Sequence, residues 1–114
     1  MKIKEVSAVS GLSADTLRYY ERIGLIHDVG RDKNGIRDYT DENMNNIAFI
    51  KCMRDAGVSI EGLIEYMKLY PQGDATKDAR RNILLAERQR LTERMEQMQT
   101  ALERLDYKLS LLQK

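Results

Sequence analysis

The residues GLSADTLRYYERIGLI at positions 11–26 contain the pattern on which the rest of the chain depends. Apolar residues recur there at helical spacing and form one stripe: Leu12, Leu17, Tyr20 and Ile23. Ser13 stands just ahead of the stripe as an N-cap, because its hydroxyl can accept hydrogen bonds from the free amides of the first turn. Gly24 ends the helix, since glycine adopts the left-handed C′ conformation without a Cβ penalty. The stretch predicts a short amphipathic helix with a defined start and end.

A second apolar stripe precedes this helix, formed by Ile3, Val6 and Val9, and it ends at Ser10-Gly11. Helix, glycine turn and helix thus follow one another within residues 3–23. This is the spacing of a helix-turn-helix, whose second helix lies in a DNA major groove.

The outward face of the second helix carries groups that bond phosphates and guanine edges. These groups belong to Thr16, Arg18, Tyr19 and Arg22. A solvated helix face is the alternative interpretation, and two arginines alone would favour it. The turn spacing and the segment that follows favour DNA binding.

Residues 26–40 lose the helical period and predict a hairpin beside the helix-turn-helix. Asn34-Gly35 predicts a type I′ turn between short strands near 26–31 and 36–39, because both residues tolerate a positive φ. The hairpin carries three cations and a phenol: Arg31, Lys33, Arg37 and Tyr39. Such a hairpin is a wing, whose cations reach backbone phosphates. An ordinary basic turn is the alternative, since aspartates lie in the same segment.

Two further helices follow the hairpin. The first spans residues 41–56 and is apolar on much of its circumference, which predicts packing against more than one partner. Ser59 caps the second, which ends near Tyr70. The Pro-Gln-Gly run at 71–73 is the clearest boundary, so we expect a DNA-binding domain over residues 1–71.

Residues 76–112 predict one long helix with a heptad seam, because apolar residues alternate at three and four positions. The seam residues are Leu84, Leu91, Met95, Met98, Leu102, Leu105, Leu109 and Leu112. Only Arg88 breaks this register. A helix of this length reaches ~54 Å, beyond the width of the preceding domain. We therefore expect it to find a partner and to serve in dimerisation.

The composition bears on four classes of function: nucleic-acid binding, membrane contact, secretion and enzyme activity. The chain has 114 residues, with 19 Lys and Arg against 18 Asp and Glu, so the totals lack the basic footprint of a nucleic-acid-binding domain. No apolar run reaches the ~20 residues of a membrane span and no signal peptide opens the chain, so we expect no membrane contact. A single cysteine cannot form an internal disulfide, which favours a cytoplasmic protein. One histidine and one cysteine give no nucleophile–base set, so we expect no enzyme activity and no cofactor.

Together, IKEVSAVSGLSADTLRYYERIGLI (3–26), GIRDYTDENMNNIAFIKCMRDAGVSIEGL (35–63) and the terminal helix resemble the MerR family of bacterial transcription regulators. The resemblance implies a winged helix-turn-helix head, mainly α with a small β-hairpin wing, on a long coiled-coil helix. It implies an antiparallel coiled-coil homodimer on a near-palindromic operator of double-stranded promoter DNA. Effector binding would make the dimer bend and untwist this DNA, which realigns the promoter elements for RNA polymerase.

The resemblance also assigns roles by position. Thr16, Arg18 and Tyr19 would face the major groove, while Tyr20 is half structural because it also lies on the apolar stripe. Arg37 and Tyr39 would contact phosphates from the wing, with Arg31 and Lys33 beside them. Ser59 and the free amides near Ile60 would hold a phosphate at a helix N-terminus.

The segment IKCMRDAGVS (50–59) most resembles the thiol- and aldehyde-stress-responsive branch related to NmlR, which makes Cys52 a candidate sensor of electrophiles. The residues alone favour a core role, since Cys52 is stacked between Ala48 and Ala56 at helical spacing. Metal-sensing members carry paired cysteines, and one cysteine cannot supply them, so no metal site is expected. A coiled-coil adaptor, or an architectural DNA-binding protein without an effector, is the alternative function.

Overall fold

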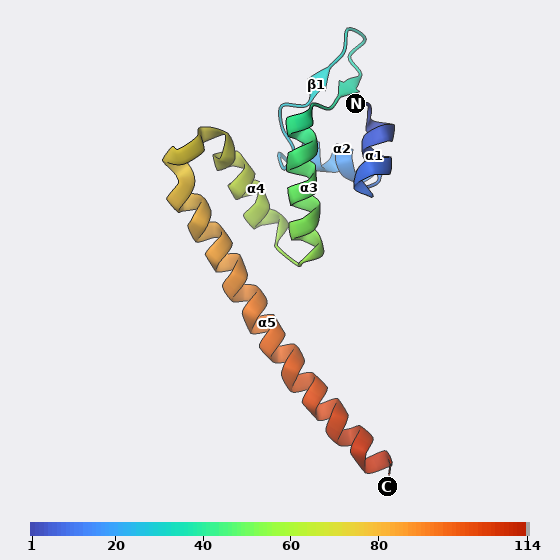
Figure 1. The fold of residues 1–114 in the computed structure, drawn as a ribbon, viewed down its shortest axis with the longest axis vertical. Coiled ribbons are helices and arrows are strands. Elements are labelled where there is room, and N and C mark those ends of the chain that lie inside the picture. Colours follow the sequence, from blue (N-terminus) through green and yellow to red (C-terminus); the bar gives the residue numbers. More distant parts are fainter. Residues whose placement is uncertain (114) are drawn as a thin grey trace.

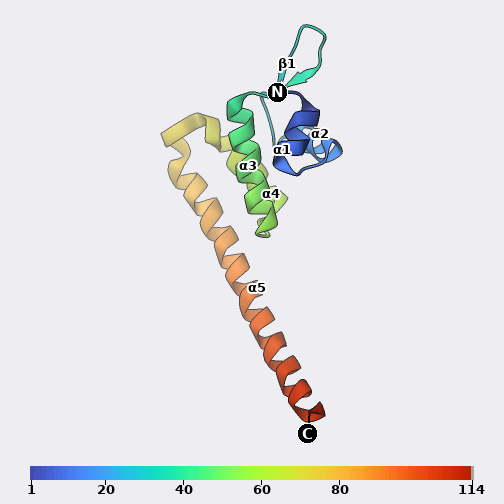
Figure 2. The same cartoon turned by 45° about the vertical axis from the view of Figure 1, so that its right-hand side comes forward.

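The computed structural model describes residues 1–113 and shows a small head from which one long helix extends (Figure 1). The head combines four helices with a two-stranded antiparallel hairpin, and a 3-10 turn leads into the long helix. In chain order the elements are α1 (Ile3–Ser10), α2 (Ala14–Arg22), β1 (Gly30–Arg31), β2 (Arg37–Asp38), α3 (Asp41–Asp55), α4 (Ile60–Leu69), the 3-10 turn (Tyr70–Thr76) and α5 (Lys77–Leu112). The expected fold class is confirmed. The molecule measures 71 × 35 × 19 Å because α5 projects far beyond the head, as both views show (Figures 1 and 2).

The helix-turn-helix forms as its caps predict. The Ser13 hydroxyl accepts a hydrogen bond from the Thr16 amide over 3.0 Å, and Gly11 has a φ of +78° where α1 ends. Leu17 is fully buried and anchors α2 in a core shared by every helix of the head. That core consists of Val6, Leu17, Tyr20, Leu25, Ile26, Tyr39, Ile47, Ile50, Val58, Leu63 and Met67.

The hairpin is present, but its turn differs from the prediction. β1 and β2 pair Gly30 with Asp38 in an antiparallel register, so the strands are shorter than expected. Gly35 has a φ of +78°, whereas Asn34 is not among the residues with positive φ, so the type I′ prediction is wrong. The reason is Asp32, whose carboxylate accepts hydrogen bonds from the amides of Asn34 at 2.8 Å and Ile36 at 3.0 Å. These two bonds hold the turn in a different conformation.

Helix α3 buries one face and leaves the opposite face outside. Ile47 and Ile50 lie in the core, while Ala48, Cys52 and Ala56 are exposed. The expectation that Cys52 is a core residue is therefore wrong. Ala48, Cys52 and Ala56 do share one face of the helix, but the face with the larger aliphatic side chains packs into the core.

The first turns of α5 run beside α4 in both views, and the rest of the helix leaves the head (Figures 1 and 2). Leu91 packs against the core of its own head, and Leu84 is half-buried near Tyr66. From Glu93 to Gln113 every residue is exposed. Among the described residues, no helix is long and apolar enough to cross a membrane.

Candidate nucleic-acid interface

Helix α2 presents an exposed polar face next to its buried one. Tyr19 is 40% exposed, and the Arg22 guanidinium lies 5.2 Å from the centre of its ring. The Arg18 guanidinium is exposed and lies 3.1 Å from the Asp15 carboxylate. Such an exposed ion pair contributes little to stability, so the arginine is held only loosely. Tyr20 is 8% exposed and belongs to the core.

Thr16 lies at the start of the same face, but its polar groups are already engaged. The Ser13 hydroxyl donates to the Thr16 hydroxyl over 2.9 Å and accepts from the Thr16 amide. The hydroxyl of Thr16 therefore has a fixed position at the N-terminus of α2.

Glu21 joins the wing to α2, a feature that the sequence did not reveal. Its carboxylate accepts from the Arg37 guanidinium over 2.6 Å and from the Arg31 guanidinium over 3.2 Å. Two of the three wing cations are thus gathered beside the helix that carries Arg18 and Tyr19. Lys33 lies exposed at the tip of the hairpin.

Tyr39 is the most unusual polar group of this surface. The side chain is 3% exposed, and its hydroxyl has no hydrogen-bond partner among the described residues. Burial raises the pKa of this phenol, an effect that the nearby Arg37 and Arg31 partly oppose. A buried hydroxyl without a partner costs about 1–3 kcal/mol.

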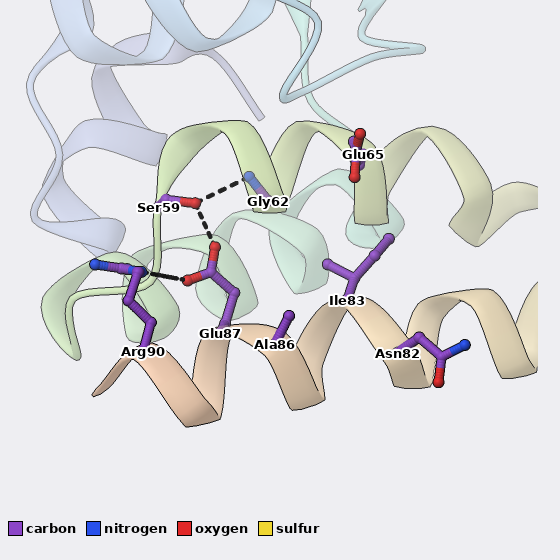
Figure 3. Close-up of a pocket in the computed structure, with 8 residues that line it drawn as sticks. All are labelled: Ser59, Gly62, Glu65, Asn82, Ile83, Ala86, Glu87 and Arg90. Atoms are coloured by element: carbon purple, nitrogen blue, oxygen red, sulfur yellow. Dashed lines mark hydrogen bonds and ion pairs between the residues drawn. The ribbon is translucent and has the colours of Figure 1, made fainter. Parts of the chain in front are cut away.

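Ser59 lies at the junction of α4 and α5 (Figure 3). Its hydroxyl accepts from the Gly62 amide over 3.1 Å, which confirms the predicted cap of α4, and it donates to the carboxylate of Glu87. Glu87 is 8% exposed and also accepts from the Arg90 guanidinium, which donates to the Gly57 carbonyl. A carboxylate thus occupies the place expected for a phosphate.

The electrostatics of Glu87 show how firmly this junction is held. Burial is the largest single influence and raises the pKa of its carboxyl. The hydrogen bonds from Ser59 and Arg90 together outweigh burial, so the pKa is lowered overall. Neither Glu87 nor Arg90 stood out in the sequence, because their spacing is ordinary for a charged helix face.

Family models and relatives agree with this geometry. A model described as MerR HTH family regulatory protein matches residues 1–69, and one described as MerR, DNA binding matches residues 44–107. The transcriptional regulator AdhR of Bacillus subtilis is 59% identical over 93 residues, which are 82% of this chain and 66% of AdhR. The match therefore spans just under two thirds of that relative's own length.

Solved structures show the same arrangement. A MerR family transcriptional regulator of Listeria monocytogenes superposes with a TM-score of 0.86 at 48% identity, covering 96% of this chain and 83% of that one. HiNmlR, a MerR family regulator that lacks the sensor domain and was solved bound to promoter DNA, gives a TM-score of 0.81 at 27% identity. That match covers 99% of this chain and 90% of HiNmlR. These relatives are named as regulators and not as enzymes. The chain belongs to the MerR family of DNA-binding transcriptional regulators.

Proposed function

We propose that α2 enters the major groove of a near-palindromic promoter operator and that the wing holds the flanking phosphates. The exposed Arg18, Tyr19 and Arg22 supply the guanidinium and phenol groups for base edges and phosphates. Thr16, fixed by Ser13, contacts the backbone where the helix begins. The recognition helix thereby carries exposed arginines along its length and a hydroxyl in a fixed position at its N-terminus.

The observation that best supports this function is the cluster around Glu21 and Tyr39. Arg31 and Arg37 already bind an anionic carboxylate beside α2, and a phosphate offers the same charge and acceptor geometry. On DNA the two arginines transfer to phosphate oxygens, and the Tyr39 hydroxyl gains an acceptor, which it lacks among the described residues of the free chain. Lys33 adds a contact from the tip of the wing. Ser59 has no place in this contact set, because Glu87 covers it.

The regulator acts as a homodimer through an antiparallel coiled coil of α5, so that two heads read two half-sites. Six seam residues of α5 are more than half exposed in one chain and need a covering partner: Met95, Met98, Leu102, Leu105, Leu109 and Leu112. The dimer distorts the DNA between the half-sites and acts indirectly on RNA polymerase. Its effect on transcription is then set by the deformability of the spacer.

Cys52 is the candidate sensor of an electrophilic effector. The thiol is exposed on α3, the helix that links the recognition elements to α4 and α5, so a reagent can reach it. Replacing Cys52 by Ser in a promoter transcription assay with an added aldehyde should keep operator binding and abolish the response. An unchanged response in the serine variant would show that Cys52 is not the sensor, whereas no response by the wild type would favour the architectural alternative, a DNA-bending protein without an effector.

The DNA-binding surface is tested with Arg18→Ala and Arg104→Ala, which remove one exposed arginine each, from α2 and from α5. Arg18→Ala should weaken operator binding by about 1–3 kcal/mol with an unchanged thermal melt. Arg104→Ala should bind like the wild type. Equal binding by both variants across a salt series would show that α2 does not face the DNA in this way.

A further inference from the structure

The exposed face of α2 begins with an acidic residue that the proposed DNA contacts do not include. Asp15 precedes the three exposed residues of this face by three, four and seven positions, which places all four side chains on one side of the helix. Those residues are Arg18, Tyr19 and Arg22. Because Ser13 caps α2, Asp15 lies in the first turn, at the end that reaches base edges in helix-turn-helix proteins.

A carboxylate at this place opposes DNA binding unless it has a specific use, because a polyanion repels it whatever its sequence. Glu21, the other acid of α2, is engaged by Arg31 and Arg37 from the wing. The Asp15 side chain is 96% exposed, and its Oδ1 accepts from Nη1 of Arg18 over 3.1 Å. Oδ2 has no hydrogen-bond partner within the part of the chain that the structure describes, so it can accept from another donor.

Together the two side chains present donors and an acceptor next to each other. The Arg18 guanidinium keeps N–H groups beyond the one that binds Asp15, and a guanine displays two acceptors in the major groove, O6 and N7. The cytosine paired with that guanine displays its 4-amino group, a donor from which a carboxylate accepts. The donors and the acceptor on the protein therefore complement the acceptors and the donor of a G·C pair.

We infer that Asp15 and Arg18 read a G·C base pair as one unit, with the guanidinium on the guanine and the carboxylate on the 4-amino group of the cytosine. This assignment rests on the proposed entry of α2 into the major groove and names a base pair that the helix selects there. Exposed in the free chain, the ion pair contributes little. In the groove, where water is displaced, the attraction between the two groups rises and orients the guanidinium toward the base.

Two simpler roles for Asp15 have different consequences. An acid in the first turn stabilises a helix through the positive end of the helix dipole, and this effect acts on the folded protein with or without DNA. An acid that only repels phosphates lowers the affinity for all sequences alike. Neither role makes binding depend on the amino group of one cytosine, so that dependence separates the inference from both.

Helix α5 supplies a matched control for the Asp15 variant. Asp78 lies in the first turn of α5, is 88% exposed and pairs with Arg81, three positions on, at 3.0 Å. The spacing and the exposure repeat those of Asp15 and Arg18. The start of α5, however, lies on the far side of α3 from α2 in both views (Figures 1 and 2). Asp78→Ala therefore removes the same charge and the same kind of ion pair from another element.

Modified bases separate the two contacts on a DNA site that the wild-type chain selects from a random double-stranded library. Replacing a guanine by 7-deazaguanine removes N7 and keeps base pairing. The guanine bound by Arg18 is the one at which this change weakens the wild type and has little effect on Arg18→Ala. Replacing the paired cytosine by N4-methylcytosine then removes the amino hydrogen that faces the major groove and again keeps base pairing.

The methylated cytosine should distinguish the variants. We expect it to raise the dissociation constant about tenfold for the wild type and for Asp78→Ala, and less than about threefold for Asp15→Ala. DNA titrations measure the three ratios, and thermal melts establish that each variant is folded. Because every ratio compares two DNAs with one protein, a general change in stability or charge cancels.

The remaining outcomes overturn one proposal or the other. An equal loss for the wild type and Asp15→Ala, or no loss for the wild type, would refute the reading of cytosine by Asp15 while leaving Arg18 on its guanine. If no guanine shows a loss that depends on Arg18, the proposed entry of α2 into the major groove fails as well.

Discussion

At the scale of single residues, the surface proposed for DNA contains a hydroxyl without a hydrogen-bond partner among the described residues and two arginines paired with a carboxylate. Tyr39 buries this hydroxyl, and the Glu21 carboxylate binds the two arginines that we assign to phosphates. The unpaired hydroxyl makes the free head slightly less stable than its core alone would allow. In the proposed complex with DNA, the Tyr39 hydroxyl would gain an acceptor and the two arginines would pair with phosphates in place of Glu21.

Tyr39→Phe separates these two effects. The change keeps the ring in the core and removes only the hydroxyl, so the free protein should melt at the wild-type temperature or above it. Operator affinity should fall by about 1 kcal/mol, roughly fivefold, because one phosphate hydrogen bond is lost. A calorimetric melt and a DNA titration on the same samples measure both. A lower melting temperature would mean that the hydroxyl has a stabilising partner in solution.

At the scale of elements, the wing depends on Asp32. Its carboxylate accepts from the Lys2 ammonium at 2.8 Å and from two turn amides, and these bonds lower its pKa from 3.8 to about 2. The bond to Lys2 is the largest cause. The bonds need the ionised form, so their contribution is present above pH 3.8 and is lost as the pH falls through about 2.

Asp32→Asn should therefore reduce the melting temperature by a constant amount at neutral pH and down to about pH 4. Between about pH 4 and pH 2 the difference from the wild type should shrink, because the wild-type carboxyl becomes protonated. Thermal melts of both proteins across this range measure the difference. A gap that persists at pH 2 would show that another property of the side chain holds the turn.

The elements also show what sequence could predict. Helix starts and stops followed from Ser13 and Gly11, because caps are decided by a few neighbouring residues. The predicted turn type was wrong at Asn34, because the Asp32 carboxylate binds the Asn34 amide. The predicted burial of Cys52 was wrong, because helical spacing does not say which face of a helix is covered. The bridge from Glu21 to the wing and the junction at Glu87 join residues distant in the chain, so no local pattern reports them.

Gly62 illustrates such a distant constraint. A Cβ at this position would meet the Glu87 carboxylate, although alanine is favoured over glycine in a helix by up to ~1 kcal/mol. We expect Gly62→Ala to destabilise the protein, because Glu87 must leave Ser59. In a Glu87→Ala background the same change should be neutral or stabilising, with a coupling of about 1 kcal/mol in denaturant melts. Equal effects in both backgrounds would show that Glu87 does not constrain Gly62.

At the scale of the whole molecule, the two halves of α5 have different roles. Its first turns pack beside α4 and tie the helix to the head through Glu87 and Arg90, and its later turns carry the free apolar stripe. A rigid helix of this kind fixes the distance and the angle between two heads once a partner is bound. In the proposed dimer, a change at the junction of α4 and α5 would be carried to both half-sites.

Leu102→Asp tests whether the stripe is the dimer interface. Leu102 is 54% exposed in one chain, so the change should be tolerated by the head, but in the dimer it would bury an unpaired carboxylate at a cost of about 3–5 kcal/mol per site. We expect monomers in sedimentation and loss of cooperative binding to a two-half-site operator, with weak binding to a single half-site retained. Leu111→Asp, on the other side of α5 at 44% exposure, is the matched control and should remain dimeric. If Leu111→Asp dissociates the dimer and Leu102→Asp does not, the helices pair through the opposite face and the seam has been placed on the wrong side of α5.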